Sequence, residues 1–341
     1  MTGKGIYRSS NTCILAVQAV DAPRVVTSAE LDERLAGTYR RVGLRAGLLE
    51  RLVGIRERRW WADDVTYAEG AAQAGAKALA ESGVDATRIE LLVNTSVSRA
   101  HLEPSTAVSV HHALGLAPSC QNFDVANACL GFLDGMQIAA AMIECGQIDY
   151  ALVVNGEDAR AVQETTIARL SGSQVTATNV IDEFATLTLG SGAAAMVLGR
   201  ADLHPEGHRV VGGATRASTE HHGLCVGDIE MMRTDSKGLL VAGLELSAAL
   251  WEDAADEFGW AAGMDRYVIH QISQVHTTAL CRTLGIDQAR VPLTFPTYGN
   301  IGPASVPYTL AKESQSLEAG DRVLLMGIGS GLNASCTEIR W

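Results

Sequence analysis

Three short segments of this chain each place a chemically useful side chain beside small residues. Cys129 lies in Asn-Ala-Cys-Leu-Gly, His270 in Val-Ile-His-Gln, and Asn300 in Tyr-Gly-Asn-Ile-Gly. A thiol can hold an acyl group as a thioester, and imidazole and carboxamide N–H groups stabilise an oxygen that becomes negative. Together the three residue types predict a site for acyl-thioester chemistry.

Each of these residues also has a simpler interpretation when it is taken alone. Most cysteines in apolar surroundings are inert, a histidine at a strand end is at least as often structural, and asparagine between glycines is typical of turns. Cys129, however, precedes a predicted helix over residues 130–144, where the helix dipole would lower a thiol pKa. The glycine-rich turn 327–331 offers a second backbone N–H. We therefore predict an oxyanion hole made by the N–H groups of Cys129 and Ser330.

The elements that must position these side chains alternate between strand-like and helical stretches. Strands are predicted over 13–20, 91–95, 122–126, 150–155, 193–198, 209–213 and 267–270, and helices over 67–82, 130–144 and 246–258. Such alternation is typical of an α/β protein with parallel strands.

The pattern recurs along the chain. Val93 and Val268, in corresponding predicted strands, are 175 residues apart, and Gly146 and Gly320, before two others, are 174 apart. One offset for two pairs predicts a duplicated half, although chance similarity of α/β units is the alternative. The predicted halves are 1–203 and 204–341. The first carries an extra stretch, about 158–189, which predicts a binding surface or an interface.

The charge of the chain restricts its partners. The net charge is −12, which argues against nucleic-acid binding. Residues 40–59 depart from this balance, with seven arginines against two glutamates. We predict that Arg51, Arg56 and Arg58 contact the phosphates of coenzyme A, although a solvated arginine-rich surface is the alternative.

The seven cysteines are odd in number and include no Cys-x-x-Cys pair, which indicates a reducing compartment. The first eleven residues lack the apolar core of a signal peptide, and no run of about 18 apolar residues predicts a membrane span. We therefore expect a cytoplasmic protein. His221, His222 and Cys225 lack a second ligand pair, so no metal site is predicted.

Residues 9–341 resemble the thiolase superfamily, in particular enzymes like β-ketoacyl-ACP synthase III. The segment 54–58, Gly-Ile-Arg-Glu-Arg, resembles an early element of that group, and Cys129, His270 and Asn300 match its catalytic residues. The resemblance implies the thiolase fold, an α/β fold of five layers, α-β-α-β-α, built from two duplicated halves. It also implies a homodimer.

The chain resembles most closely the branch of this superfamily that serves bacterial long-chain olefin biosynthesis. The resemblance to that branch is carried by segments 127–132, 102–106, 220–225, 232–240 and 299–302. Two departures from synthase III concern the carrier: His-Gln-Ile-Ser at 270–273 replaces its His-Gln-Ala-Asn, and Leu52 replaces an arginine.

The resemblance implies a role for Glu103, which matches a glutamate of that branch that reaches into the partner subunit's active site. Condensing two acyl thioesters without losing CO₂ requires a base that removes an α-proton. The implied reaction is a non-decarboxylative Claisen condensation of two fatty acyl-CoA molecules to a 2-alkyl-3-oxoalkanoic acid. It implies no cofactor besides acyl-CoA as substrate, and a β-keto acid reductase and a β-lactone synthetase as downstream partners. Without the resemblance, Glu103 is a solvated loop residue.

Three alternatives stay open at this point. A decarboxylating synthase III-like enzyme would use malonyl-ACP and would not depend on Glu103. An acyltransferase or thioesterase would use Cys129 without forming a C–C bond. A non-catalytic subunit of a heterodimer would not need the four candidate catalytic residues. All four are present: Cys129, His270, Asn300 and Glu103. The sequence predicts neither the length of the acyl chain nor whether the enzyme prefers CoA or ACP as the acyl carrier.

Overall fold

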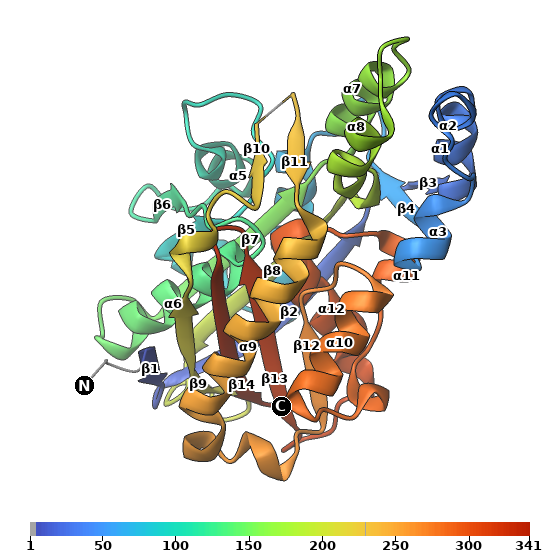
Figure 1. Ribbon diagram of the computed structural model, residues 1–341. Coiled ribbons are helices and arrows are strands. Elements are labelled where there is room, and N and C mark those ends of the chain that lie inside the picture. Colours follow the sequence, from blue (N-terminus) through green and yellow to red (C-terminus); the bar gives the residue numbers. More distant parts are fainter. Residues whose placement is uncertain (1–4, 229) are drawn as a thin grey trace.

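A mixed sheet of ten strands forms the centre of the structure (Figure 1). The computed structural model describes residues 5–228 and 230–341. Residues 1–4 belong to the N-terminal segment for which no signal peptide is predicted, and they lie outside the described residues. The strands of the sheet are β1 (Gly5–Arg8), β2 (Thr12–Asp21), β5 (Leu91–Asn94), β6 (Gln121–Asp124), β7 (Tyr150–Glu157), β8 (Gly192–Arg200), β9 (His208–Ala217), β12 (Arg266–Ile269), β13 (Arg322–Gly329) and β14 (Asn333–Arg340). Their order is β6-β5-β7-β8-β2-β9-β14-β13-β12, with β1 beside β9.

The strands on the two sides of the sheet centre follow the same order of parallel and antiparallel pairings. β5 pairs parallel with β7, β7 antiparallel with β8, and β8 antiparallel with β2; β12, β13, β14 and β9 repeat these directions. β2 and β9 meet through two residue pairs, Cys13 with Arg209 and Ile14 with His208. This repeated order supports the proposal that 1–203 and 204–341 are duplicated halves joined in the β8–β9 turn.

The prediction of a parallel sheet was wrong for six of the nine strand pairings in the sheet. Parallel pairing joins β5 to β6 and β7, and β12 to β13, whereas β8, β2, β9 and β14 pair antiparallel. The turn from β13 to β14 has three residues, 330–332. A connection that short allows only an antiparallel neighbour, because a parallel crossover needs a dozen or more residues.

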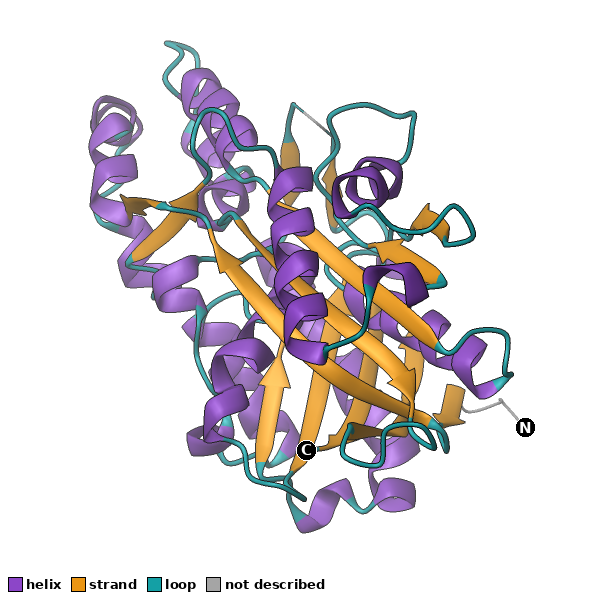
Figure 2. Ribbon diagram, turned by 180° about the vertical axis from the view of Figure 1, so that it is seen from behind, coloured by secondary structure: helices purple, strands orange, loops and turns teal. Residues whose placement is uncertain are grey.

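Helices lie on both sides of each half-sheet and produce five layers. α4 (Tyr67–Ser82) and α5 (Thr106–Leu114) pack on one half, and α9 (Ser236–Phe258) and α10 (Gln274–Leu284) on the other. α6 (Gly131–Glu144) and α12 (Ser305–Glu313) share one apolar core with strands of both halves. Figure 1 shows α9 in front of the strands, and Figure 2 shows helices in front of them from behind. The order α-β-α-β-α is the expected thiolase fold.

The central helix α6 approaches its sheet closely. Phe132, Leu133 and Met136 are each at most 3% exposed. A Cβ added at Gly135 would come 2.8 Å from Cγ2 of Thr95, so a larger residue there would push the helix away from β5. The large buried side chains of α6 and the glycine that faces β5 therefore fix the position of the first turn of α6. This also fixes the position of Cys129.

A side lobe carries the arginine-rich segment. It contains β3 (Arg24–Thr27), α1 (Ser28–Arg34), α2 (Ala36–Val42), α3 (Leu48–Val53), β4 (Glu57–Trp60), η2 (Phe184–Thr188), α7 (Arg160–Leu170) and α8 (Ala177–Asp182). α7, α8 and η2 form the stretch predicted as an insertion at about 158–189. They share an apolar core with α1–α3, and Figure 1 shows them side by side. A separate hairpin, β10 (Cys225–Gly227) and β11 (Met232–Thr234), stands near α5 in the same view.

Candidate active site

Cys129 lies in a tight turn between β6 and α6. Ala128 has a φ of 45°, a backbone conformation that residues with a side chain seldom adopt. The turn is closed by hydrogen bonds from Leu130 N to Asn127 O (3.0 Å) and from Gly131 N to Ala128 O (3.2 Å). The Asn127 side chain donates to Asp134 Oδ2 over 2.6 Å. Local hydrogen bonds therefore hold Cys129 at the start of α6.

The prediction of a lowered thiol pKa at Cys129 was wrong. Burial, with smaller contributions from Glu157 and Cys225, raises the pKa of Cys129 to about 12. A helix dipole is worth about 0.3–1 kcal/mol, which is less than one pKa unit and too little to offset that burial. The resting site therefore holds a neutral thiol, and its chemistry needs a base.

His270 directly follows β12 and lies beside β13. Its N–H donates to Met326 O over 2.7 Å, and the residue is 8% exposed. Burial, with a smaller effect of His276, lowers the pKa of His270 to about 4. Within the described residues its Nδ1 has no hydrogen-bond partner. A neutral imidazole of this kind can accept a proton from the neutral thiol.

Asn300 is held by the insertion of the first half. Its N–H donates to Thr188 O, and its carbonyl accepts from Gly190 N, each over 2.9 Å. A Cβ at Gly190 would come 1.9 Å from Tyr298 O, so only glycine allows this approach. The Asn300 Oδ1 accepts from Gly302 N over 2.9 Å, which leaves its Nδ2 to donate toward a ligand.

The turn that carries Cys129, the turn that carries Ser330 and the strand end that carries His270 all lie beside β13. A Cβ at Gly327 would come 2.7 Å from Cδ1 of Leu130, and one at Gly329 would come 3.2 Å from Leu130 N. The turn with Ser330 thus lies against the turn with Cys129, and His270 flanks the same strand, β13. The structure therefore brings Cys129, His270 and Ser330 to one place, and the oxyanion hole of Cys129 and Ser330 remains a prediction.

Sequence reasoning missed Glu157, a buried carboxylate in this region. It ends β7 and is 7% exposed. Burial raises the pKa of Glu157 to about 7, although hydrogen bonds from Ser98, Val97 and Asn155 lower it. A Cβ at Gly302 would come 3.7 Å from its Cδ, so Glu157 lies between the Asn300 loop and the thiol whose pKa it raises. Its position at the carboxyl end of a strand next to β5 was the available signal.

Among the residues that the structure describes, no hydrogen bond connects Glu103 to the turn that carries Cys129. Glu103 is exposed on the loop between β5 and α5, and its neighbour Leu102 is 99% exposed. The exposed position is the one that contact with a second subunit would require, so that role remains a prediction.

The structure separates the three arginines predicted to contact coenzyme A. Arg58 is 0% exposed and donates to Ser28 Oγ and Leu187 O, each over 3.0 Å, and burial lowers its pKa to about 10. A buried guanidinium cannot reach a phosphate, so the prediction for Arg58 was wrong. Arg51 and Arg56 are exposed.

The segment with Arg51 and Arg56 lies beside the site. Arg56 N donates to Pro296 O over 2.9 Å, four residues before Asn300. A Cβ at Gly54 would come 3.3 Å from Cβ of Gln274, four residues after His270. The phosphate-binding role of Arg51 and Arg56 therefore remains a prediction with a suitable location.

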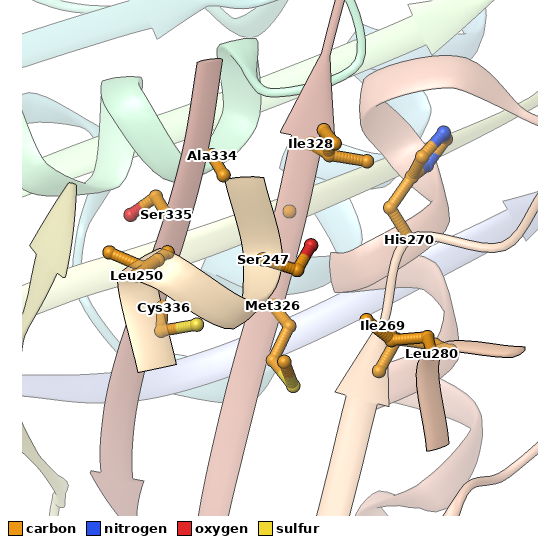
Figure 3. A pocket seen from close by; sticks show the side chains of 11 residues that line it. Ser247, Leu250, Ile269, His270, Leu280, Met326, Ile328, Ala334, Ser335 and Cys336 are labelled. Carbon is orange, nitrogen blue, oxygen red and sulfur yellow. The ribbon is translucent and has the colours of Figure 1, made fainter. Parts of the chain in front are cut away.

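A small apolar cavity lies behind His270. Figure 3 shows it between α9, β13 and β14, with the His270 ring turned away from Met326. Its volume is about 30 Å³, which is about the size of one water molecule. An acyl chain enters this space only if side chains such as Leu250 and Ile328 move.

Within 5–228 and 230–341 no three His, Cys, Asp or Glu side chains are grouped so as to hold a metal ion. None of the helices in those ranges is both long and apolar enough to cross a membrane.

Family comparison places the chain among condensing enzymes. Residues 123–218 match 3-oxoacyl-[acyl-carrier-protein (ACP)] synthase III, and residues 261–341 match the C-terminal part of that family. The chain is 48% identical to the acyl-CoA:acyl-CoA alkyltransferase of Xanthomonas campestris pv. campestris, over 97% of this chain and 99% of that protein. It is 36% identical to the enzyme of the same name from Shewanella oneidensis, over 94% and 96%.

Solved structures agree with these relatives. OleA of Xanthomonas campestris with bound cerulenin has a TM-score of 0.96 and 47% identity, over 98% of each chain. A variant of that protein with a cysteine replaced by serine, solved with lauric acid and lauroyl-CoA, has a TM-score of 0.95 and 47% identity, over 97% of this chain and 99% of that chain. Both similarities cover nearly the whole of this chain.

Proposed function

The chain belongs to the 3-oxoacyl-[acyl-carrier-protein] synthase III family of the thiolase superfamily, and from this premise we propose that it condenses two fatty acyl-CoA molecules without loss of CO₂. The observation that carries the proposal is the nearly full-length similarity to two acyl-CoA:acyl-CoA alkyltransferases. A decarboxylating synthase is supported less, because the β-ketoacyl-ACP synthase III of Rhodospirillum rubrum is 30% identical to this chain.

The first half-reaction forms an acyl-cysteine. The Cys129 sulfur attacks the carbonyl carbon of the first acyl-CoA, and neutral His270 takes the thiol proton, as the raised thiol pKa requires. The N–H groups of Cys129 and Ser330 hold the carbonyl oxygen while it is negative. The bond to the CoA sulfur then breaks, and CoA leaves with the proton that His270 carried.

The second half-reaction forms the C–C bond. Glu103 of the neighbouring subunit removes a proton from the α-carbon of the second acyl-CoA, and N–H donors of His270 and Asn300 hold the enolate oxygen. The α-carbon attacks the Cys129 thioester, and the sulfur leaves and regains a proton. Water then hydrolyses the remaining CoA thioester, which yields a 2-alkyl-3-oxoalkanoic acid and a second CoA.

Variants among the solved relatives support this choice of residues. Structures of Xanthomonas campestris OleA exist in which a glutamate, a cysteine or a histidine is replaced, and these residues follow one another in that order. The glutamate and the cysteine are 26 residues apart there, as Glu103 and Cys129 are here.

We further propose the setting of this reaction. The chain acts as a cytoplasmic homodimer that completes each site with Glu103, and it uses acyl-CoA as substrate with no other cofactor. Its β-keto acid product is chemically unstable toward decarboxylation. A β-keto acid reductase and a β-lactone synthetase acting downstream would consume it.

Incubation of the purified chain with myristoyl-CoA alone tests the proposal. We expect a doubled-chain β-keto acid, or the ketone formed by its decarboxylation, with two CoA released per product. Mass spectrometry identifies the product, and a thiol assay counts CoA. Cys129→Ala abolishes both acylation and product, whereas Glu103→Ala keeps the acyl-cysteine and loses the product. Glu33→Ala, at another exposed glutamate, is the matched control and leaves both intact.

Other results select other functions. Free myristate without a doubled chain indicates a thioesterase. Turnover that begins only when malonyl-ACP is added, with release of CO₂ and no effect of Glu103→Ala, indicates a decarboxylating synthase. A chain that neither acylates Cys129 nor turns over is a non-catalytic subunit.

A further inference from the structure

The loop that carries Glu103 is held at both of its ends by carboxylates, a buried one at Glu157 and a partly buried one at Asp124. It runs over residues 95–105, from the end of β5 to the start of α5. Its tip, residues 101–104, is exposed. The stems on either side of this tip are tied to other elements, because five backbone N–H groups there donate to side chains: those of Val97, Ser98, Ala100, Thr106 and Ala107.

Glu157 holds the first stem. One carboxylate oxygen accepts from Val97 N over 2.7 Å, and the other accepts from Ser98 N over 3.0 Å and from Ser98 Oγ over 2.7 Å. Three donors on two oxygens fix both the position and the direction of the loop where it leaves β5. These contacts join two consecutive loop residues to the end of β7, so this stem is firmly anchored.

Asp124 holds the second stem. It accepts from Thr106 N over 3.0 Å and from Ala107 N over 2.9 Å, where α5 begins. It also pairs with Arg99 over 3.2 Å, and Arg99 belongs to the first stem. One carboxylate thus ties the two stems to each other.

The same two carboxylates belong to the strands around the nucleophile. Asp124 ends β6, five residues before Cys129, and Glu157 ends β7 and raises the pKa of the Cys129 thiol. A third support comes from α4, where the Tyr67 hydroxyl accepts from Ala100 N over 3.0 Å. The loop is therefore built on the strand ends that position Cys129 and leaves only its tip unsupported.

We propose that Asp124 and Glu157 are positioning residues, a carboxylate clamp that holds the loop of residues 95–105 in the shape in which Glu103 takes part in the condensation. This inference rests on the proposed function, in which Glu103 removes the α-proton. Neither carboxylate touches substrate. Each acts through the loop, so loss of Asp124 affects the step that needs Glu103 and spares the step that needs only Cys129 and His270.

Asp124→Asn is the decisive variant, because Glu157 contributes to the raised pKa of the Cys129 thiol and Asp124 is not among the groups that do. With myristoyl-CoA we expect acylation of Cys129, measured as the first CoA released per site, to stay within twofold of wild type. We expect condensation, measured as doubled-chain product, to fall about tenfold or more. Glu157→Gln should also lower condensation, but its acylation rate does not test the clamp, because Glu157 raises the pKa of the Cys129 thiol.

Glu144→Gln is the matched control. Glu144 also accepts backbone N–H groups, from Ser10 and Asn11, but at the far end of α6. It should lose stability without changing the ratio of condensation to acylation. If Asp124→Asn lowers both steps equally, or neither, the clamp is refuted.

A double-mutant cycle separates the clamp from an independent effect. If Asp124 acts through Glu103, then Asp124→Asn causes no further loss of condensation in a Glu103→Gln chain. Losses that multiply refute the proposal.

Hydrogen exchange supplies a readout that does not depend on turnover. We expect the amides of residues 97–107 to exchange at least tenfold faster in Asp124→Asn than in wild type, and to be unchanged in Glu144→Gln. If wild type yields no doubled-chain product, the proposed function fails, and the role of the clamp in condensation fails with it. The exchange result then still decides whether the carboxylates hold the loop, and unchanged exchange refutes that as well.

Discussion

Asn333 donates a hydrogen bond from its Nδ2 to the Oδ1 of Asn127 over 3.2 Å, across 206 residues of sequence. Asn333 begins β14, and Asn127 closes the turn that holds Cys129. The Asn127 amide in turn donates to Asp134 on α6. The second half of the chain therefore steadies the nucleophile turn of the first.

Replacement of Asn333 tests this connection. Asn333→Ala should slow acylation of Cys129 by about fivefold, because a neutral hydrogen bond of this kind is worth about 1 kcal/mol. Single-turnover CoA release measures the rate. Thr337→Ala, on the same strand away from the turn, is the comparison, and an Asn333→Ala chain that acylates at the wild-type rate contradicts the expectation.

The conformation of Ala128 gives a second prediction. At a φ of 45° a β-branched side chain meets the neighbouring backbone, so Ala128→Val should cost about 1–2 kcal/mol of stability and reduce acylation. Ala128→Gly should keep the stability of the wild type, since glycine adopts this φ freely. Urea unfolding measures both. Equal stability of the two variants would argue against strain in the turn.

Alkylation of Cys129 with iodoacetamide tests its protonation state. Since the pKa of this thiol is raised to about 12, the thiolate fraction grows tenfold per pH unit across the accessible range. We expect the alkylation rate to rise about tenfold per pH unit, and so about a hundredfold from pH 7 to pH 9. Mass spectrometry of the Cys129 peptide follows it, with the exposed Cys145 as internal reference. A plateau that begins near pH 6 would indicate a thiolate–imidazolium pair instead.

The three arginines should divide into two classes. Arg58→Ala removes a buried guanidinium with two hydrogen bonds and should lower the free energy of unfolding by about 3 kcal/mol. Arg51→Ala and Arg56→Ala should leave stability unchanged and raise the KM for acyl-CoA severalfold. Urea unfolding and steady-state kinetics measure the two effects. An Arg58→Ala chain of normal stability with a raised KM would reverse our correction.

Glu144 gives a prediction about pH and stability. Burial alone would raise its pKa, but hydrogen bonds from Ser9, Asn11, Ser10 and Thr12 outweigh it and lower the pKa to about 2. A lowered folded-state pKa stabilises the fold above the unfolded value of 4.5, and that stability is lost as the pH falls toward 2. Glu144→Gln should therefore be less stable than wild type at pH 7, by about 1–2 kcal/mol.

Urea midpoints at pH 7 and pH 3 measure the difference for Glu144→Gln. The two proteins should converge at the lower pH, because wild-type Glu144 then begins to take up a proton. A gap that is the same at both pH values would mean that the charge of Glu144 contributes nothing.

Elements with strong local signals were predicted to within a residue or two. The helix over 67–82 matches α4 at both ends, because Thr66 caps it and Gly83, with a φ of 68°, ends it. The predicted helix over 246–258 begins ten residues too late. α9 starts at Ser236, where Asp235 caps it, but Gly238 and Gly243 in its first turns obscure the helical periodicity.

The chemistry of the site was predicted less completely than its residues. Cys129, His270 and Asn300 follow strands or glycines, which are local features that the sequence displays. The raised thiol pKa depends on burial by segments that are distant in sequence. The carboxylates of Asp124 and Glu157 likewise take their partners from another element, about 60 residues away for Glu157, so no spacing rule identifies them.

The division of the site between the two halves of the sheet has a consequence for protein synthesis. The ribosome makes His270 141 residues after Cys129, a delay on the order of ten seconds at about 5–20 residues per second. Throughout that interval the nascent chain has a nucleophile but neither the imidazole, the Asn300 amide nor the Ser330 turn. A prematurely terminated product that ends before His270 therefore has no condensing activity. Errors of translation thus do not release a partly active enzyme into a cell that contains acyl-CoA.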